Sequence, residues 1–288
     1  MTYAFAMPMQ GSSRRLLANQ YFEQVARGAS IKLPSGARRI QNLAYGSNPM
    51  QKMDVYIPQS AKHAPVIFMV HGGAWARGDK AAYNVVQNKI DYFLPKGYVF
   101  ISTNYRLAPE VGVMTEADDV AHALAYAQQH AAEWGGNPSR FVLMGHSAGA
   151  HLVTMLSSVP AIWQGAGAKP WLGTVALDSA AYNVVKIMGS SHFRLYDRVF
   201  GKDPKLWDEA SPTLRLKSAP PPMLLVCSTL RRNSCDQAAA FANKANALGG
   251  RVKVMPVAMR HAEINEEVGA SIPYTKEIDS FLRSLGLN

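Results

Sequence analysis

The chain has 288 residues, of which 48% are hydrophobic, so it is long enough to bury a large core within one domain. Its net charge of +10 favours anionic partners, but the basic residues are scattered in short pairs without a zinc, RNP or helix-turn-helix motif, and we expect no nucleic-acid partner. No apolar run approaches the ~20 residues of a membrane span and no secretory leader is visible, so we expect a soluble protein, either cytoplasmic or exported with its leader removed.

Apolar segments of strand length alternate with helical segments, after a first helix expected near residues 13–27. The first two strands, 39–45 and 52–58, flank a turn at 46–49 and predict an antiparallel hairpin. Further strands are expected at 66–71, 98–103, 140–145, 173–179, 222–228 and 252–257. Helices are expected between and after them at 116–134, 234–249 and 278–285. This alternation predicts an α/β fold with a mostly parallel central sheet and helices on both faces.

The domain organisation follows from the same pattern. We expect one domain over residues 1–288, which includes an N-terminal helical segment over 1–38. Residues 180–219 are too many for a simple crossover between two strands, and long ordered insertions are usually functional. We therefore expect them to form a small cap insertion over the strand ends, although the same residues would also suit a helix packed on the surface of the sheet.

The strongest functional motif is Gly145-His146-Ser147-Ala148-Gly149, which directly follows one predicted strand and directly precedes a helical segment. Glycines on both sides allow a sharp strand-to-helix turn that leaves the serine side chain exposed where a base can reach it. This context predicts that Ser147 is a nucleophile.

A second motif, His71-Gly72-Gly73-Ala74-Trp75, follows the strand at 66–71. Small residues at this place leave backbone N–H groups free to stabilise a developing oxyanion. We expect Gly73, Ala74 and Ala148 to supply these groups, and His71 to have a structural role in the loop.

The base is expected to be His261, because it follows the last predicted core strand and fits the chain order serine, acid, histidine. The acid should follow the strand at 222–228, and the only carboxylate of that loop is Asp236, which also fits a helix-dipole role in a first turn. Asp178, at the end of the neighbouring strand, and the neutral amide of Asn233 are the alternatives. The prediction is Ser147, His261 and Asp236, with both alternatives open.

The two cysteines, Cys227 and Cys235, fit no metal-binding spacing. Cys227 lies in an apolar run, so we expect it to be a small buried hydrophobic residue in preference to one half of a disulfide with Cys235. The sequence implies no metal and no organic cofactor.

At these motifs the chain resembles bacterial hormone-sensitive-lipase-like carboxylesterases and the related feruloyl and acetyl esterases of the α/β-hydrolase fold. The resemblance extends from about Met53 to the C-terminal end, and it implies the roles given above to Ser147, His261 and the three amides. Many members carry an aspartate near the positions held here by Arg231, Arg232 and Asn233. The segments that carry the resemblance are 71–75, 102–110, 135–151 and 221–226.

The resemblance and the motifs together predict a serine carboxylesterase that forms an acyl-enzyme on Ser147. Apolar residues of the expected cap, among them Phe193, Tyr196 and Phe200, favour small aryl or short-chain esters as the small-molecule substrates. Two alternatives stay open: an amide or formamide hydrolase similar to kynurenine formamidases, and a non-catalytic binding module on the same fold. The natural ester and the oligomeric state are not predicted.

Overall fold

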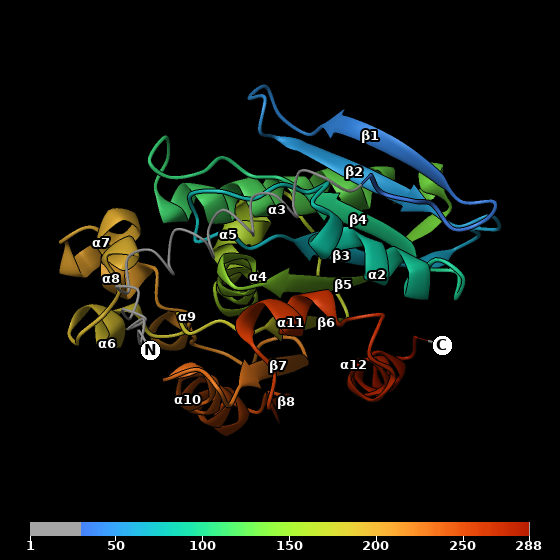
Figure 1. Ribbon diagram of the computed structural model, residues 1–288. Coiled ribbons are helices and arrows are strands. Elements are labelled where there is room, and N and C mark those ends of the chain that lie inside the picture. Colours follow the sequence, from blue (N-terminus) through green and yellow to red (C-terminus); the bar gives the residue numbers. More distant parts are fainter. Residues whose placement is uncertain (1–29, 288) are drawn as a thin grey trace, which may run out of the picture.

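The computed structural model describes residues 30–287 (Figure 1). The helix expected near residues 13–27, and with it most of the N-terminal segment 1–38, lies outside these residues. The described chain enters the sheet at β1 (Arg38–Ala44), which pairs with β2 (Lys52–Ile57) as the predicted antiparallel hairpin.

The central sheet has eight strands in the order β1-β2-β4-β3-β5-β6-β7-β8. The hairpin joins the sheet through an antiparallel β2–β4 pair, and all pairs from β4 to β8 are parallel. The parallel strands are β3 (Ala64–Val70), β4 (Val99–Thr103), β5 (Gly136–His146), β6 (Gly173–Leu177), β7 (Met223–Ser228) and β8 (Val252–Val257). Every residue of β3, β4, β6 and β7 is buried because helices cover both faces, which explains why these strands are continuous apolar runs in the sequence. The predicted mostly parallel sheet is confirmed.

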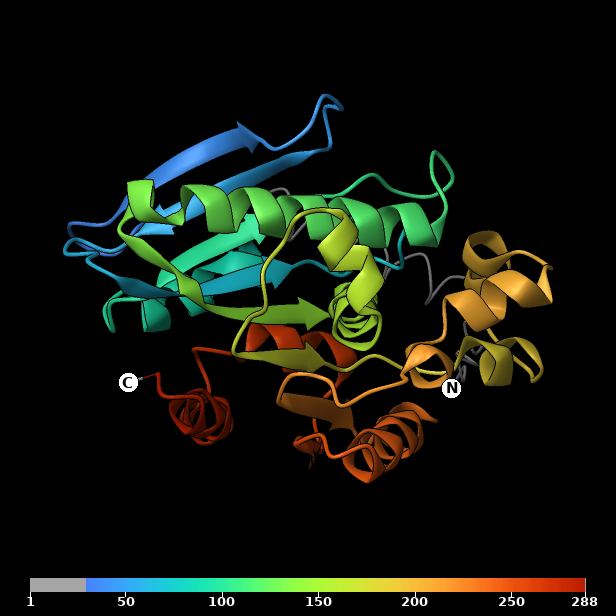
Figure 2. The same ribbon diagram turned by 180° about the vertical axis from the view of Figure 1, so that it is seen from behind.

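Two helical layers enclose this sheet. The helices α2 (Tyr83–Phe93), α11 (His261–Glu266) and α12 (Ile272–Ser284) pack on one face, in front of the sheet in Figure 1. The other face, turned toward the viewer in Figure 2, carries α3 (Val113–His130), α4 (Ala148–Ser158) and α10 (Ser234–Ala247). Two short elements, η1 (Ala131–Trp134) and α5 (Pro160–Gly165), complete this layer.

Residues between β6 and β7 form four short helices, which lie beyond the carboxyl ends of β5 and β6 (Figure 2). These helices are α6 (Val184–Met188), α7 (Arg194–Phe200), α8 (Pro204–Glu209) and α9 (Pro212–Arg215). The helix α7 contacts Trp75, which lies in the loop after β3. The Trp75 ring centroid is 5.1 Å from that of Phe200 and 6.0 Å from that of Tyr196. The insertion is thus attached to the loop that follows β3.

A disulfide joins Cys227, at the end of β7, to Cys235, in the first turn of α10. The expectation that Cys227 is unpaired was wrong, although the residue is fully buried as expected. The sequence alone does not show that the loop after β7 turns back on itself, which brings the two Cα atoms within 5.1 Å of each other.

In the part of the chain that the structure describes, no helix combines the length and the apolar character required to cross a bilayer.

Candidate active site

Ser147 lies in the turn between β5 and α4, with a backbone φ of 56° and ψ of −114° that few non-glycine residues adopt. Glycines make this turn possible. A Cβ atom on Gly145 would lie 2.3 Å from the carbonyl oxygen of Gly149, and one on Gly149 would lie 2.1 Å from the carbonyl oxygen of Val70. The structure therefore places Ser147 on the tight turn that the motif predicts, where its side chain is partly exposed.

His261 begins α11, directly beyond the loop after β8. Its ring atom Nε2 lies 2.8 Å from Ser147 Oγ, and Nδ1 lies 2.5 Å from Asp178 Oδ2. Ser147, His261 and Asp178 thus form one continuous chain of hydrogen bonds across the ends of three strands.

The carboxylate that reaches His261 is Asp178, and the expectation of Asp236 was wrong. Asp178 follows β6, which lies between β5 and β7 in the sheet, and its fully buried side chain contacts His261 at the start of α11. Asp236 is exposed to solvent in the first turn of α10. Asn233, the other alternative, is also exposed and is the N-cap residue of that helix.

Asp178 is held by more than the histidine. Its Oδ1 accepts hydrogen bonds from the backbone N–H of Ser228 (3.0 Å) and from the Ser234 hydroxyl, and its Oδ2 also accepts one from Arg231 Nη1 (3.0 Å). Burial alone would raise the pKa of this carboxyl group, but the hydrogen bond with His261 and the charge of Arg231 outweigh it and hold the pKa well below its usual range. Asp178 is therefore ionised at neutral pH.

Burial lowers the pKa of His261, and the nearby charge of Arg231 lowers it further, while the hydrogen bond to Asp178 opposes both effects. The ring is therefore neutral at pH 7. A neutral ring that donates Nδ1–H to Asp178 presents the Nε2 lone pair to the Ser147 hydroxyl, which is the arrangement of a general base.

The loop after β3 lies against the same turn, since a Cβ atom on Gly72 would lie 3.0 Å from Ser147 Cβ. Gly73, Ala74 and Trp75 all have positive φ, and a Cβ atom on Gly73 would lie 1.9 Å from the Arg77 carbonyl oxygen. Within residues 30–287, the N–H groups of Gly73 and Ala74 make no hydrogen bond, and that of Ala148 is in the first turn of α4, where helices leave N–H groups without partners. These are the three groups that the sequence analysis assigned to an oxyanion hole.

The side chains of this loop hold it in place. His71 is fully buried, its ring stacks 4.6 Å from the Tyr105 ring, and its carbonyl oxygen accepts a hydrogen bond from the Tyr105 hydroxyl (3.1 Å). Trp75 Nε1 donates to His151 Nδ1 (3.2 Å), and His151 Nε2 donates to the carbonyl oxygen of Ala210 (2.8 Å). The loop is thereby fastened to the sheet, to α4 and to the helical insertion.

Two site residues were missed by the sequence reasoning. His146 donates from Nε2 to the carbonyl oxygen of His261 (2.9 Å), and its ring lies 4.6 Å from the His261 ring. Arg231 contacts both Asp178 and His261. The position of His146 next to Ser147 was a usable signal. Arg231 lies on the loop expected beside the site, but nothing in the sequence predicts its contact with Asp178.

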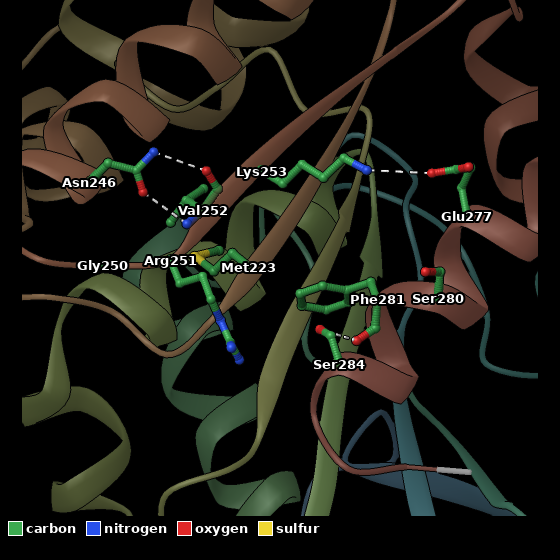
Figure 3. Close-up of a pocket in the computed structure, with 10 residues that line it drawn as sticks. All are labelled: Met223, Asn246, Gly250, Arg251, Val252, Lys253, Glu277, Ser280, Phe281 and Ser284. Carbon is green, nitrogen blue, oxygen red and sulfur yellow. Dashed lines mark hydrogen bonds and ion pairs between the residues drawn. The ribbon is translucent and has the colours of Figure 1, made fainter.

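The surface depression drawn in Figure 3 lies elsewhere. It has a volume of about 460 Å³ and opens between α12 and the first residues of β7 and β8, where Met223, Val252 and Phe281 line it. The triad residues lie at the opposite, carboxyl ends of the strands. Among residues 30–287, no group of three or more histidine, cysteine, aspartate or glutamate side chains is arranged to hold a metal ion.

Comparison with known proteins gives consistent results. Residues 53–162 match the BD-FAE family. The chain is 25% identical over 238 residues to isoprenylcysteine alpha-carbonyl methylesterase ICME of Arabidopsis thaliana, an alignment that covers 75% of this chain and 54% of that protein. It is 29% identical over 180 residues to esterase LipQ of Mycobacterium tuberculosis, covering 57% of this chain and 41% of LipQ. The chain thus spans about half the length of these curated relatives or less.

Solved structures match over nearly the whole chain. Esterase B of Lactobacillus rhamnosis, in complex with a tributyrin phosphonate inhibitor, superposes with a TM-score of 0.77 at 20% identity, covering 98% of this chain and 96% of that one. Esterase 2 of Thermogutta terrifontis gives a TM-score of 0.71 at 23% identity, covering 91% and 97%. These likenesses confirm the predicted α/β-hydrolase fold.

Proposed function

We propose that this α/β hydrolase is a serine carboxylesterase. The observation that carries the proposal is the unbroken series of hydrogen bonds from Ser147 Oγ through His261 to Asp178. Beside it lies the loop after β3, where the N–H groups of Gly73 and Ala74 have no partner among residues 30–287. Each part of acyl transfer has a group in position to perform it.

In the proposed mechanism, His261 Nε2 takes the proton of Ser147 as Oγ attacks the ester carbonyl carbon. The carbonyl oxygen becomes an oxyanion, which the N–H groups of Gly73, Ala74 and Ala148 stabilise. The imidazolium formed on His261 is stabilised by Asp178 and gives its proton to the departing alcohol, so that an acyl-enzyme remains on Ser147. Water, deprotonated by the same histidine, then releases the carboxylic acid.

An ester is preferred over an amide as the substrate because the relatives are named for ester hydrolysis. ICME is named a methylesterase and LipQ an esterase. The structural neighbour from Lactobacillus rhamnosis is described with a phosphonate derived from tributyrin, a short-chain ester. These names support carboxylic esters of modest size as the substrate class of this chain.

The helices α6–α9 are proposed to be a cap on a single α/β-hydrolase domain. Their support is the contact of Trp75 with α7 and the position of the insertion beyond the strand ends. Tyr196 and Phe200 are buried against Trp75, so of the three aromatic residues considered in the sequence analysis only Phe193 is exposed, with 68% of its surface accessible. This exposed ring favours small aryl or short-chain esters.

The test is hydrolysis of p-nitrophenyl acetate by the protein and by its Ser147→Ala variant. Loss of the nucleophile should lower kcat by about 10⁶, as in other serine hydrolases. Ser139→Ala removes a hydroxyl group from an exposed position of β5 and serves as the matched control, expected to retain full activity. A fluorophosphonate probe should label the protein at Ser147 and should not label the alanine variant.

Matched ester and anilide substrates test the alternatives. Faster turnover of the ester supports the proposal, whereas preference for the anilide or for a formamide makes the protein an amide hydrolase. Unchanged hydrolysis in the Ser147→Ala variant would remove the serine mechanism altogether.

A further inference from the structure

Arg231 lies in the loop between β7 and α10 and reaches back to the end of β6. Its Nη1 atom is 3.0 Å from Asp178 Oδ2, 3.0 Å from the Asp178 carbonyl oxygen and 3.1 Å from His261 Nδ1. One guanidinium nitrogen therefore touches both the acid and the base of the site.

The loop that carries Arg231 is fastened on both sides. Before it, the Ser228 hydroxyl donates to the Met259 carbonyl oxygen (2.6 Å), and after it the Ser234 hydroxyl donates to Asp178. The disulfide between Cys227 and Cys235 closes the loop covalently. The side chain of Arg231 is 29% exposed, so its position beside Asp178 is due to these contacts and not to burial of the whole residue.

We propose that Arg231 is a positioning residue of the active site, which anchors Asp178 beneath His261 and places a fixed positive charge against the histidine ring. The proposal deepens the proposed esterase function and rests on it.

The anchoring follows from donor and acceptor chemistry. Arginine has only donors, so Nη1 cannot accept the Nδ1–H of His261, and its bond goes to Asp178. Asp178 Oδ2 is shared by the histidine and the arginine, while Oδ1 is held by Ser228 and Ser234. Both oxygens are therefore held in place, and the carboxylate cannot rotate away from His261 without breaking several bonds.

The charge effect follows from the groups that face the His261 ring. Asp178 at the end of β6 is negative, and His146 at the end of β5 is neutral because burial holds its pKa well below the ordinary value. The charge of Lys89, on α2, acts on His146. On α11 itself, the Glu263 carboxylate accepts a hydrogen bond from the backbone N–H of Arg260. Arg231 is thus the positive group in contact with the ring, and it opposes protonation of His261.

An arginine in this place keeps His261 in its basic form at lower pH. Arg231 lowers the pH at which the His261 ring becomes protonated. At a pH between this value and the higher value expected without Arg231, the ring is still a neutral, active base in the protein with arginine and is already protonated in the protein without it. The predicted signature is a change in the acid limb of the pH profile, which loss of structure by itself would not produce.

The first experiment compares kcat/KM for p-nitrophenyl acetate across pH in the wild type and in Arg231→Met, Arg231→Lys and Arg232→Met. In Arg231→Met, the ratio of kcat/KM at pH 5.5 to that at pH 8 should fall by up to about fivefold, since one unit charge at 4 Å is worth about 1 kcal/mol in bulk water and a shift of that size changes the neutral fraction of the ring by at most this factor. Arg231→Lys keeps the charge and should keep most of the ratio. Arg232→Met alters an exposed neighbour and should leave the ratio unchanged.

An unchanged ratio in Arg231→Met, or an equal fall in Arg232→Met, overturns the proposal. The lysine variant covers the case in which the methionine variant fails to fold: a full loss of the ratio in Arg231→Lys would also overturn it.

The second experiment does not depend on turnover. Nitrogen-15 NMR follows the titration of the His261 ring in Ser147→Ala and in the Ser147→Ala, Arg231→Met double variant. The ring should titrate at higher pH in the double variant, and an unmoved or lowered midpoint overturns the inference. If this midpoint moves as expected but the wild type hydrolyses no ester, the proposed function fails and the role of Arg231 stands.

Discussion

The proposed active site has two parts that are built in different ways. The part that comes from β3, β5 and α4 is made by backbone: Ser147, Gly73 and Ala74 all have positive φ, and the glycines around them have no room for a side chain. The part that comes from the ends of β6, β7 and β8 is made by side chains. Asp178, Arg231, Ser234 and His261 contact one another directly.

The comparison teaches where each kind of substitution should act. In the backbone part, a change of residue type alters the course of the chain, so it should be visible in the stability of the protein. In the side-chain part, several neighbouring groups hold Asp178 and His261 together. A substitution of one of them should therefore leave the fold intact and lower the rate of hydrolysis.

In the side-chain part, the largest expected effect is on the rate. Asp178→Asn should lower kcat by about 10⁴, because the amide cannot stabilise the imidazolium and favours the wrong tautomer of His261. The measurement is kcat for p-nitrophenyl acetate, with the fold checked by circular dichroism.

Asp236→Asn is the matched control, since the same change is made to an exposed residue of α10. Its kcat should stay within twofold of the wild type. A large loss in the control with little loss at Asp178 would reverse the assignment of the acid.

In the backbone part, Gly149→Ala should destabilise the protein by about 4 kcal/mol or more, because the new Cβ atom would lie 2.1 Å from the Val70 carbonyl oxygen and 2.6 Å from that of His71. Urea unfolding measures the change. Gly165→Ala, in α5, meets no atom within 4 Å and should change stability by about 1 kcal/mol or less. Equal stabilities of the two variants would contradict the distinction between the parts.

The protein also contains a buried acid outside the proposed site, Glu116. Glu116 of α3 is fully buried, and burial followed by the like charge of Asp119 raises its pKa from 4.5 to about 9. The folded protein therefore holds a proton that the unfolded chain releases between about pH 4.5 and pH 9, so this group makes stability fall as pH rises through that window.

Glu116→Gln should remove this dependence, so that its stability relative to the wild type rises by about 4 kcal/mol between pH 5 and pH 8. Urea midpoints at the two pH values measure it. Glu110→Gln, at an exposed position, is the control. A gain of the same size at both pH values would show that ionisation of Glu116 is not the cause.

A buried base, Lys89, contacts the helix that carries His261. Lys89 of α2 donates from Nζ to the carbonyl oxygen (2.7 Å) and the Oδ1 atom (2.9 Å) of Asn265, on the helix that begins with His261. Burial lowers its pKa from 10.5 to about 7, so between these values the folded protein binds fewer protons than the unfolded chain and stability rises with pH.

Lys89→Met should flatten this rise, which is expected to be about 1–2 kcal/mol between pH 7 and pH 9 in the wild type. Thermal unfolding at several pH values measures it, with Lys62→Met, at an exposed position, as the control. A wild-type slope that persists in Lys89→Met would assign the rise to another group.

The contrast between the two parts also explains what could be predicted from the sequence. The turn at Ser147 and the loop at Gly73 depend on neighbouring residues in the chain, so short motifs contain the necessary information. The parallel strands were predictable for a related reason, since burial on both faces requires continuous apolar runs.

The acid and Arg231 were harder because their positions depend on the order of strands in the sheet. Asp236 was chosen for its place after β7, but the loop after β7 directs Arg231 toward the site and Asp236 toward solvent. Asp178, which the sequence analysis kept as an alternative, reaches His261 from the end of β6. The sequence shows neither which of the two loops turns toward His261 nor the return of the loop that pairs the two cysteines.

The disulfide has a consequence for engineering of the protein. Because Cys227 and Cys235 join the two ends of the loop covalently, the separation of these ends does not depend on the residues between them. Thr229, Leu230 and Arg232 are exposed, whereas Arg231 and Ser234 hold Asp178. The three exposed positions can therefore be varied in a library to change the surface of this loop. Arg231 and Ser234 stay unchanged in such a library and continue to hold Asp178.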